Sequence, residues 1–166
     1  YIERLSPLCE EAHSSITGGK ESIKIESEQK FEGTESEIAD AFEKALAVRA
    51  EKDTDLGYTS IGPHRDDLKI KVDGTDVKTY GSQGQQRTAA LALKLAETEI
   101  FKERYGEYPV LILDDAMSEL DRGRRKRLID GVKKMQTIIT CTEPDCVPDY
   151  DKYKNVFIEN GKIIKE

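Results

Sequence analysis

The stretch Val110-Leu111-Ile112-Leu113-Asp114-Asp115 decides the fold class of this chain. An apolar run entered by Pro109 ends there in two adjacent carboxylates. Such a run is typical of a strand that is covered on both faces, as in the parallel sheets of α/β proteins. Ligands of open α/β sheets bind beyond the carboxyl ends of the strands, so Asp114 and Asp115 are expected where a nucleotide would lie. The alternative is a strand that simply ends at a solvated turn.

The elements around this strand extend the same pattern. Helical spacing predicts a long helix over 82–105 and a second helix over 122–134, and a β-branched run predicts a second buried strand over 137–140. Helices that alternate with buried strands indicate an α/β layered domain. The pair Asn160-Gly161 predicts a terminal hairpin over 155–164.

Charge divides the chain into two parts. The 166 residues carry a formal net charge of −7, and the first 56 contain 14 acidic and 7 basic side chains, so the whole acidic excess lies there. Alternation predicts a strand over 22–27, and helical spacing predicts a helix over 35–52. We therefore expect a small α+β unit over 1–56 and a second unit over 57–166.

Composition excludes several classes. No stretch approaches the ~20 apolar residues of a membrane helix, so we expect a protein of the cytoplasm without a membrane partner. Three cysteines without paired spacing argue against a disulfide framework or structural zinc. The balanced charge of 57–166 argues against a uniformly basic nucleic-acid surface. The run Arg122–Arg127, with five basic residues in six positions, is either a basic patch or a solvated helix face.

The segment Ser82-Gln83-Gly84-Gln85-Gln86-Arg87 lies where the long helix begins. Ser82 suits an N-cap, Gly84 allows a ligand to approach the backbone, and helix N–H groups can bind an anion. The alternative is an ordinary capped helix. Downstream, Ser118-Glu119-Leu120-Asp121 could contribute to a site or cap the following helix.

Taken in order, these motifs resemble the C-terminal half of an ABC-type ATPase head. Together with Gly62-Pro63-His64-Arg65-Asp66-Asp67-Leu68 they resemble the SMC-like RecF family of bacterial recombination and repair proteins, closely over 58–142. The resemblance implies an α/β fold, in which 57–166 is the C-terminal part of the ATPase head and 1–56 is the remnant of an arm-like second domain.

The resemblance also assigns roles to the site residues. Ser82, Gln83, Gly84 and Gln85 match the signature motif, which contacts the γ-phosphate of ATP held by the partner subunit. Gln83 departs from the glycine usual in transporters.

The remaining roles fall on residues beyond the long helix. Asp114 matches the acid that holds Mg²⁺, and Asp115 occupies the place of the catalytic Glu, where its shorter side chain implies slow hydrolysis. Asp121 matches the D-loop aspartate that communicates across the dimer. Thr140 lies where most ABC proteins carry a switch histidine. His64 is expected to be structural or solvent-facing rather than catalytic.

The function implied by the resemblance is ATP-dependent DNA binding in recombinational repair and replication restart, including the SOS response. ATP would drive dimerisation of the heads, and slow hydrolysis would reset it. The implied partners are DNA junctions or gapped duplex, a second copy of the protein, and mediators of the RecR and RecO type. The alternatives are a transporter ATPase subunit and a non-catalytic interaction module.

The phosphate-binding sequence Gly-x-x-x-x-Gly-Lys-[Ser/Thr] does not occur in these 166 residues. In such heads it belongs to the N-terminal half. We therefore expect this chain alone neither to bind ATP tightly nor to hydrolyse it. The parent protein is expected to be a weak ATPase, because the resemblance places the short acid Asp115 at the catalytic position.

Overall fold

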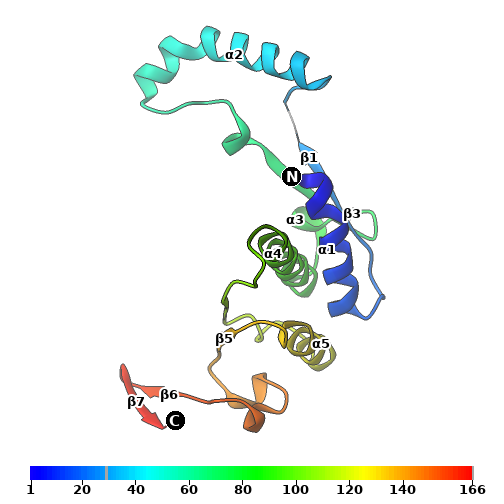
Figure 1. Ribbon diagram of the computed structural model, residues 1–166, viewed down its shortest axis with the longest axis vertical. Coiled ribbons are helices and arrows are strands. Elements are labelled where there is room, and N and C mark those ends of the chain that lie inside the picture. The colour runs from blue at the N-terminus through cyan, green and yellow to red at the C-terminus, as the bar shows by residue number, and fades with distance from the viewer. Residues whose placement is uncertain (29, 166) are drawn as a thin grey trace. The chain divides into compact units, whose positions relative to one another are not determined.

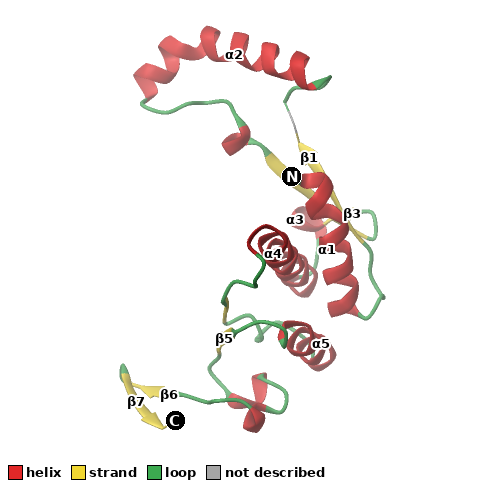
Figure 2. Cartoon of the chain, viewed as in Figure 1, coloured by secondary structure: helices red, strands yellow, loops and turns green. Residues whose placement is uncertain are grey.

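The computed structural model describes residues 1–28 and 30–165 and has a mixed α/β architecture (Figure 1, Figure 2). It divides into two compact units, one formed by 1–24 and 70–166 and the other by 25–69. This division by compactness differs from the boundary near residue 56 that the charge pattern suggested. The assignment of 1–56 to an arm-like domain stays a prediction.

The larger unit contains the expected alternation of helices and strands. Its elements are α1 (Ile2–Thr17), α3 (Val77–Tyr80), α4 (Gln83–Tyr105), β4 (Leu111–Asp114), α5 (Arg122–Val132), β5 (Thr137–Thr140), β6 (Phe157–Glu159) and β7 (Lys162–Lys165). Strands β4 and β5 are parallel, in a register that pairs Leu111 with Thr137 and Asp114 with Thr140. The predicted α/β class is therefore confirmed.

The core of this unit lies where α1 packs against both α4 and α5 (Figure 1). Small side chains let the helices approach closely, since Ala92 and Ala96 of α4 are fully buried. Leu128 of α5 is also fully buried, and burial of one such side chain contributes about 1.5–3 kcal/mol. Packing against α1 thus joins α4 and α5 in one core.

The prediction that the strand over 110–113 is covered on both faces is wrong for this chain. Leu111 and Leu113 are buried, but the side chain of Ile112 is 64% exposed and that of its β5 neighbour Ile138 is 50% exposed. Side chains alternate across a strand, so one face of the β4–β5 pair packs on the core and the other does not. A continuous apolar run cannot distinguish these two cases.

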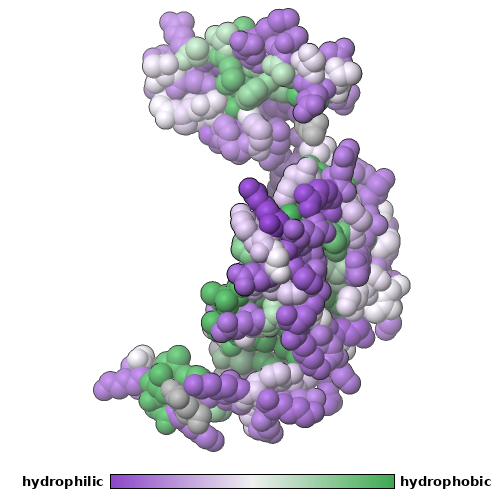
Figure 3. All heavy atoms as spheres, in the orientation of Figure 1, coloured by the Kyte–Doolittle hydropathy of each residue, from purple (hydrophilic) through white to green (hydrophobic). Residues whose placement is uncertain are grey.

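The terminal hairpin forms as predicted, with Asn160 and Gly161 both at positive φ in the turn between β6 and β7. Isoleucines of this hairpin are exposed, and apolar groups gather over it in Figure 3. None of the helices in the described part of the chain has the length and apolar character needed to cross a bilayer.

The elements around the smaller unit are β1 (Ile23–Glu28), α2 (Glu35–Leu56), β2 (Asp67–Val72) and β3 (Thr75–Asp76). The three strands form a sheet in the order β1-β2-β3, and the boundary between the units falls within β1 and β2. Helix α2 begins at a capping box, in which Thr34 and Glu37 exchange side-chain and backbone hydrogen bonds. The predicted apolar stripe is half-buried, and its residues are Ile38, Ala41, Phe42, Ala45 and Leu46.

Candidate functional site

The carboxyl ends of β4 and β5 bring Asp114, Asp115 and Thr140 together. Thr140 and Asp114 are register partners, and the Thr140 hydroxyl donates to the Asp114 carboxylate. The backbone N–H of Asp115 donates to the same hydroxyl oxygen at 3.1 Å. The threonine therefore contacts the carboxylate of Asp114 and the backbone of Asp115, and both aspartates are exposed to a ligand.

Asp115 adopts a left-handed backbone conformation, with a φ of 46°. Few residues other than glycine take this conformation, and aspartate is among those that do so more readily. The conformation ends β4 and turns the chain into the loop that leads to Asp121. The second carboxylate is thus presented on a turn and not on the strand.

The start of α4 is a capping box. The Ser82 side-chain oxygen accepts from the Gln85 N–H at 3.2 Å, and the Gln85 side chain accepts from the Ser82 N–H at 3.0 Å. Gln83 is exposed. A hydroxyl that accepts at a cap can still donate its own proton, so capping and phosphate binding by Ser82 are compatible.

Gly84 lies beside the loop that follows β4. A Cβ built on Gly84 would lie 3.8 Å from the Glu119 carbonyl oxygen, which is ordinary van der Waals contact. The fold of this chain therefore has room for a methyl group at Gly84. Packing within the chain does not account for a glycine there.

Asp121 caps the start of α5, as one of the sequence interpretations proposed. Its Oδ1 accepts from the Gly123 N–H at 2.8 Å and the Arg124 N–H at 3.0 Å. The hydrogen bond from the Arg124 backbone is the main cause that lowers the pKa of Asp121. The predicted D-loop residue is therefore an exposed, ionised carboxylate at the end of a helix.

Two arginines that sequence analysis left without a role hold the loop over 115–121. Arg87 of α4 donates to the Asp115 carbonyl oxygen. Arg125 of α5 donates to the Leu120 carbonyl at 2.7 Å and to the Ser118 carbonyl at 3.3 Å. The loop that joins the two predicted motifs is thus fixed from both helices.

The run Arg122–Arg127 is therefore neither a plain basic patch nor a plain solvated face. Arg124, Arg125 and Arg127 are half-buried and bind other parts of the chain. Arg127 donates to the carbonyls of Ile16 at 2.7 Å and Thr17 at 3.3 Å, which completes the C-terminus of α1. Periodicity alone could not show these contacts, because their partners lie far away in the sequence.

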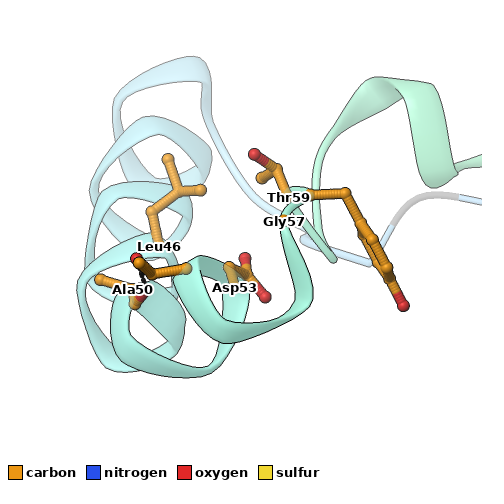
Figure 4. A pocket seen from close by; sticks show the side chains of 7 residues that line it. Leu46, Ala50, Asp53, Gly57 and Thr59 are labelled. Atoms are coloured by element: carbon orange, nitrogen blue, oxygen red, sulfur yellow. Dashed lines mark hydrogen bonds between the residues drawn. The ribbon is translucent and has the colours of Figure 1, made fainter.

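His64 lies in the smaller unit, where it is exposed. Its Nε2 is 3.0 Å from the Thr59 carbonyl oxygen, as the structural interpretation expects. A shallow hollow also lies in that unit, beside the C-terminal half of α2 (Figure 4). Its lining residues are Leu46, Ala50, Asp53, Thr54, Gly57, Tyr58 and Thr59, none of which belongs to the predicted site.

The structure contains a capped helix start, a parallel strand that ends in two carboxylates, a capped second helix and a second parallel strand. This order agrees with the C-terminal part of an ABC-type ATPase head, the class that the solved structures below support. No family model matches the chain. It is 45% identical over 165 residues to the DNA replication and repair protein RecF of Clostridium perfringens, and 40% identical over 168 residues to the protein of the same name from Clostridium beijerinckii. These matches cover 98% and 100% of the chain.

Solved structures give the same result. The recombination mediator protein RecF, solved as RecF-ATPrS in the RecFOR pathway, superposes with a TM-score of 0.64 and 38% identity over 89% of this chain. The chain therefore belongs to the RecF family, and its fold matches that of the solved RecF protein. It covers 45% and 46% of the two relatives and 40% of the solved chain, so it spans less than half of their length.

Proposed function

We propose that this chain supplies the signature motif and the magnesium and water-positioning acids of an ATP-dependent DNA-binding protein. That protein would act in recombinational repair and replication restart. ATP binding would drive dimerisation of its heads and so control DNA binding, and slow hydrolysis would reset the dimer. The curated relatives of this chain are named DNA replication and repair protein RecF, and a solved structure similar to the chain is that of RecF-ATP.

The observation that carries the proposal is the pair of polar surfaces described above. The start of α4 presents an exposed helix N-terminus with Ser82 and Gly84, and the strand ends present Asp114 and Asp115. Arg87 links the two surfaces through the Asp115 carbonyl. A helix N-terminus attracts phosphate, whereas carboxylates repel it unless a cation intervenes. The first surface thus suits a phosphate group, which the resemblance assigns to a nucleotide held by the partner subunit. The second surface suits a nucleotide with a bound metal ion.

Mg²⁺ fits the residues at the strand ends. It prefers oxygen ligands, keeps several waters and is often bound through one or two carboxylates together with substrate phosphates. Asp114 would hold the ion through its water shell, and the Thr140 hydroxyl fixes the orientation of that carboxylate. When bound, the ion neutralises charge on the phosphates. Asp115 would accept a proton from, or orient, the attacking water.

The partners follow from the same resemblance. We propose ATP and Mg²⁺ as ligands, a second copy of the protein as the ATP-dependent partner, and DNA junctions or gapped duplex as the nucleic acid. Mediators of the RecR and RecO type would bind the assembled form. The protein would act in the cytoplasm.

The test is Ser82→Arg in the full-length protein. The long side chain obstructs the helix start that faces the partner's nucleotide, but it leaves the subunit's own phosphate loop untouched. We expect monomers to bind fluorescent ATP with unchanged affinity, while ATP no longer raises the mass measured by light scattering. Hydrolysis and stable DNA association should be lost with the dimer.

Thr34→Arg is the matched control. Thr34 caps α2 in a capping box of the same type, so its replacement removes an equivalent cap at about 1 kcal/mol. We expect this variant to dimerise with ATP as the parent does. Normal dimerisation by Ser82→Arg would leave Ser82 as a helix cap and overturn the proposal.

A further inference from the structure

The Arg124 guanidinium joins three segments of the larger unit. It donates to the Thr88 hydroxyl at 2.7 Å and to the Gly84 carbonyl at 3.3 Å, both in α4. Its other edge donates to Glu21, in the turn between α1 and β1, at 2.7 Å. Its Nε lies 3.3 Å from the Asp121 carboxylate. One side chain thus touches the predicted signature helix, the predicted D-loop and a third, distant segment.

Thr88 extends this contact into the first turn of α4. Its side chain is fully buried, and its hydroxyl donates to the Gly84 carbonyl at 2.6 Å while it accepts from Arg124. The Gly84 carbonyl therefore receives hydrogen bonds from two side chains. The first turn of α4, which carries the predicted signature residues, is thus hydrogen-bonded to α5 through Arg124.

Glu21 is the counter-charge that holds Arg124 in place. The side chains of Glu21 and Arg124 are only 16% and 17% exposed, so their ion pair is partly shielded from water. The second carboxylate oxygen of Glu21 lies 4.0 Å from Nε2 of the fully buried His13. Removal of one partner from such a pair leaves the other charge poorly solvated.

We propose that Arg124 is a positioning residue, oriented by Glu21, that makes the signature helix and the D-loop move as one body during ATP-dependent dimerisation. This inference rests on the proposed function, in which both surfaces face the partner subunit. The planar guanidinium donates in several fixed directions at once, and a lysine ammonium cannot reproduce that fork. Glu21, which lies outside both motifs, would therefore influence assembly of the dimer through Arg124.

The test uses Arg124→Lys, Glu21→Gln and the double variant of the full-length protein. Arg124→Lys keeps the charge but loses the three-way contact. We expect the ATP concentration for half-maximal dimerisation to rise at least about tenfold in each single variant. Nucleotide affinity of the monomer should stay within about twofold, which is near 0.4 kcal/mol. The double variant should be no worse than Arg124→Lys, because both changes break one unit.

Arg127→Lys is the matched control. Arg127 lies on the same helix and makes two hydrogen bonds to backbone carbonyls of α1. Its replacement should lower the thermal midpoint without changing the ATP dependence of dimerisation. Equal effects of Arg124→Lys and Arg127→Lys on both measurements would reduce Arg124 to a structural role and overturn the inference.

Ser82→Arg distinguishes failure of the inference from failure of the proposed function. If Ser82→Arg abolishes dimerisation while Arg124→Lys and Glu21→Gln dimerise normally, the inference fails and the proposed function stands. If Ser82→Arg also dimerises normally, the proposed function fails and the inference fails with it.

Discussion

Replacing Gly84 with alanine separates a role in the fold from a role in assembly. Within this chain the added methyl group would lie 3.8 Å from the Glu119 carbonyl oxygen, so it meets no clash. Alanine in place of glycine within a helix stabilises by roughly 0.5–1 kcal/mol, because the unfolded chain loses less freedom on folding. We expect the thermal midpoint of the full-length protein to stay equal or to rise.

Assembly should respond in the opposite direction. If Gly84 faces a nucleotide held by the partner, its new methyl group occupies space that the ligand needs. Overpacking of this kind costs about 1–3 kcal/mol, which corresponds to roughly 5–150-fold in affinity at each site. A dimer that encloses two nucleotides would meet this cost twice.

The assay compares thermal unfolding with ATP-dependent light scattering on the same preparation. Gly131→Ala is the control, since it also replaces a helical glycine of this unit and its added Cβ meets nothing within 4 Å. We expect Gly131→Ala to dimerise normally. A Gly84→Ala protein that is stable and dimerises at the parental ATP concentration would refute the argument that Gly84 faces a ligand.

Four further outcomes are expected. Asp115→Asn in the full-length protein should slow ATP hydrolysis by at least about 100-fold, with dimerisation preserved, because the amide keeps the shape of the group but not its basicity; turnover like the parent's would remove Asp115 from its assigned role. Asp114→Asn should instead raise the Mg²⁺ concentration required for hydrolysis, measured by magnesium titration. Burial lowers the pKa of His13, and the Glu21 carboxylate compensates in part, so the folded state favours the neutral ring. This group's contribution to the free energy of unfolding should be fully present above the ordinary pKa near 6.5 and should be lost as the pH falls below it. The free energy of unfolding, measured by denaturant titration at several pH values, should therefore fall more steeply with decreasing pH than it does in a His13→Gln protein. This chain alone should give no saturable micromolar isotherm in calorimetric titration with Mg-ATP, because the phosphate loop supplies most ground-state contacts.

Local sequence signals predicted several of the helices and strands and the order of the motifs along the chain. The apolar run before Asp114 predicted β4, Asn160-Gly161 predicted the hairpin, and Ser82 predicted the start of α4. Each of these features depends on residues within one turn or one strand, where spacing and conformational preference act directly. The spacing of Ser82 and Gln85 also fits a capping box, which was not predicted.

Contacts between distant segments could not be predicted in the same way. Arg124 and Glu21 are 103 positions apart, and Arg127 lies 111 positions from Ile16, whose carbonyl it binds. A run of basic residues has the same composition whether it faces water or the ends of other helices. The exposure of Ile112 was missed for a related reason, because an apolar strand does not reveal which of its faces has a partner.

If Asp115 is the water-positioning acid proposed above, its left-handed backbone limits how this protein could be engineered toward faster turnover. Asp115→Glu would lengthen the side chain by one methylene. It would also place at a φ of 46° a residue that adopts positive φ less readily than aspartate does. A mutant library for faster hydrolysis should therefore vary the neighbouring residues of the turn together with residue 115. If residue 115 alone were varied, its positive φ would disfavour most of the substitutions.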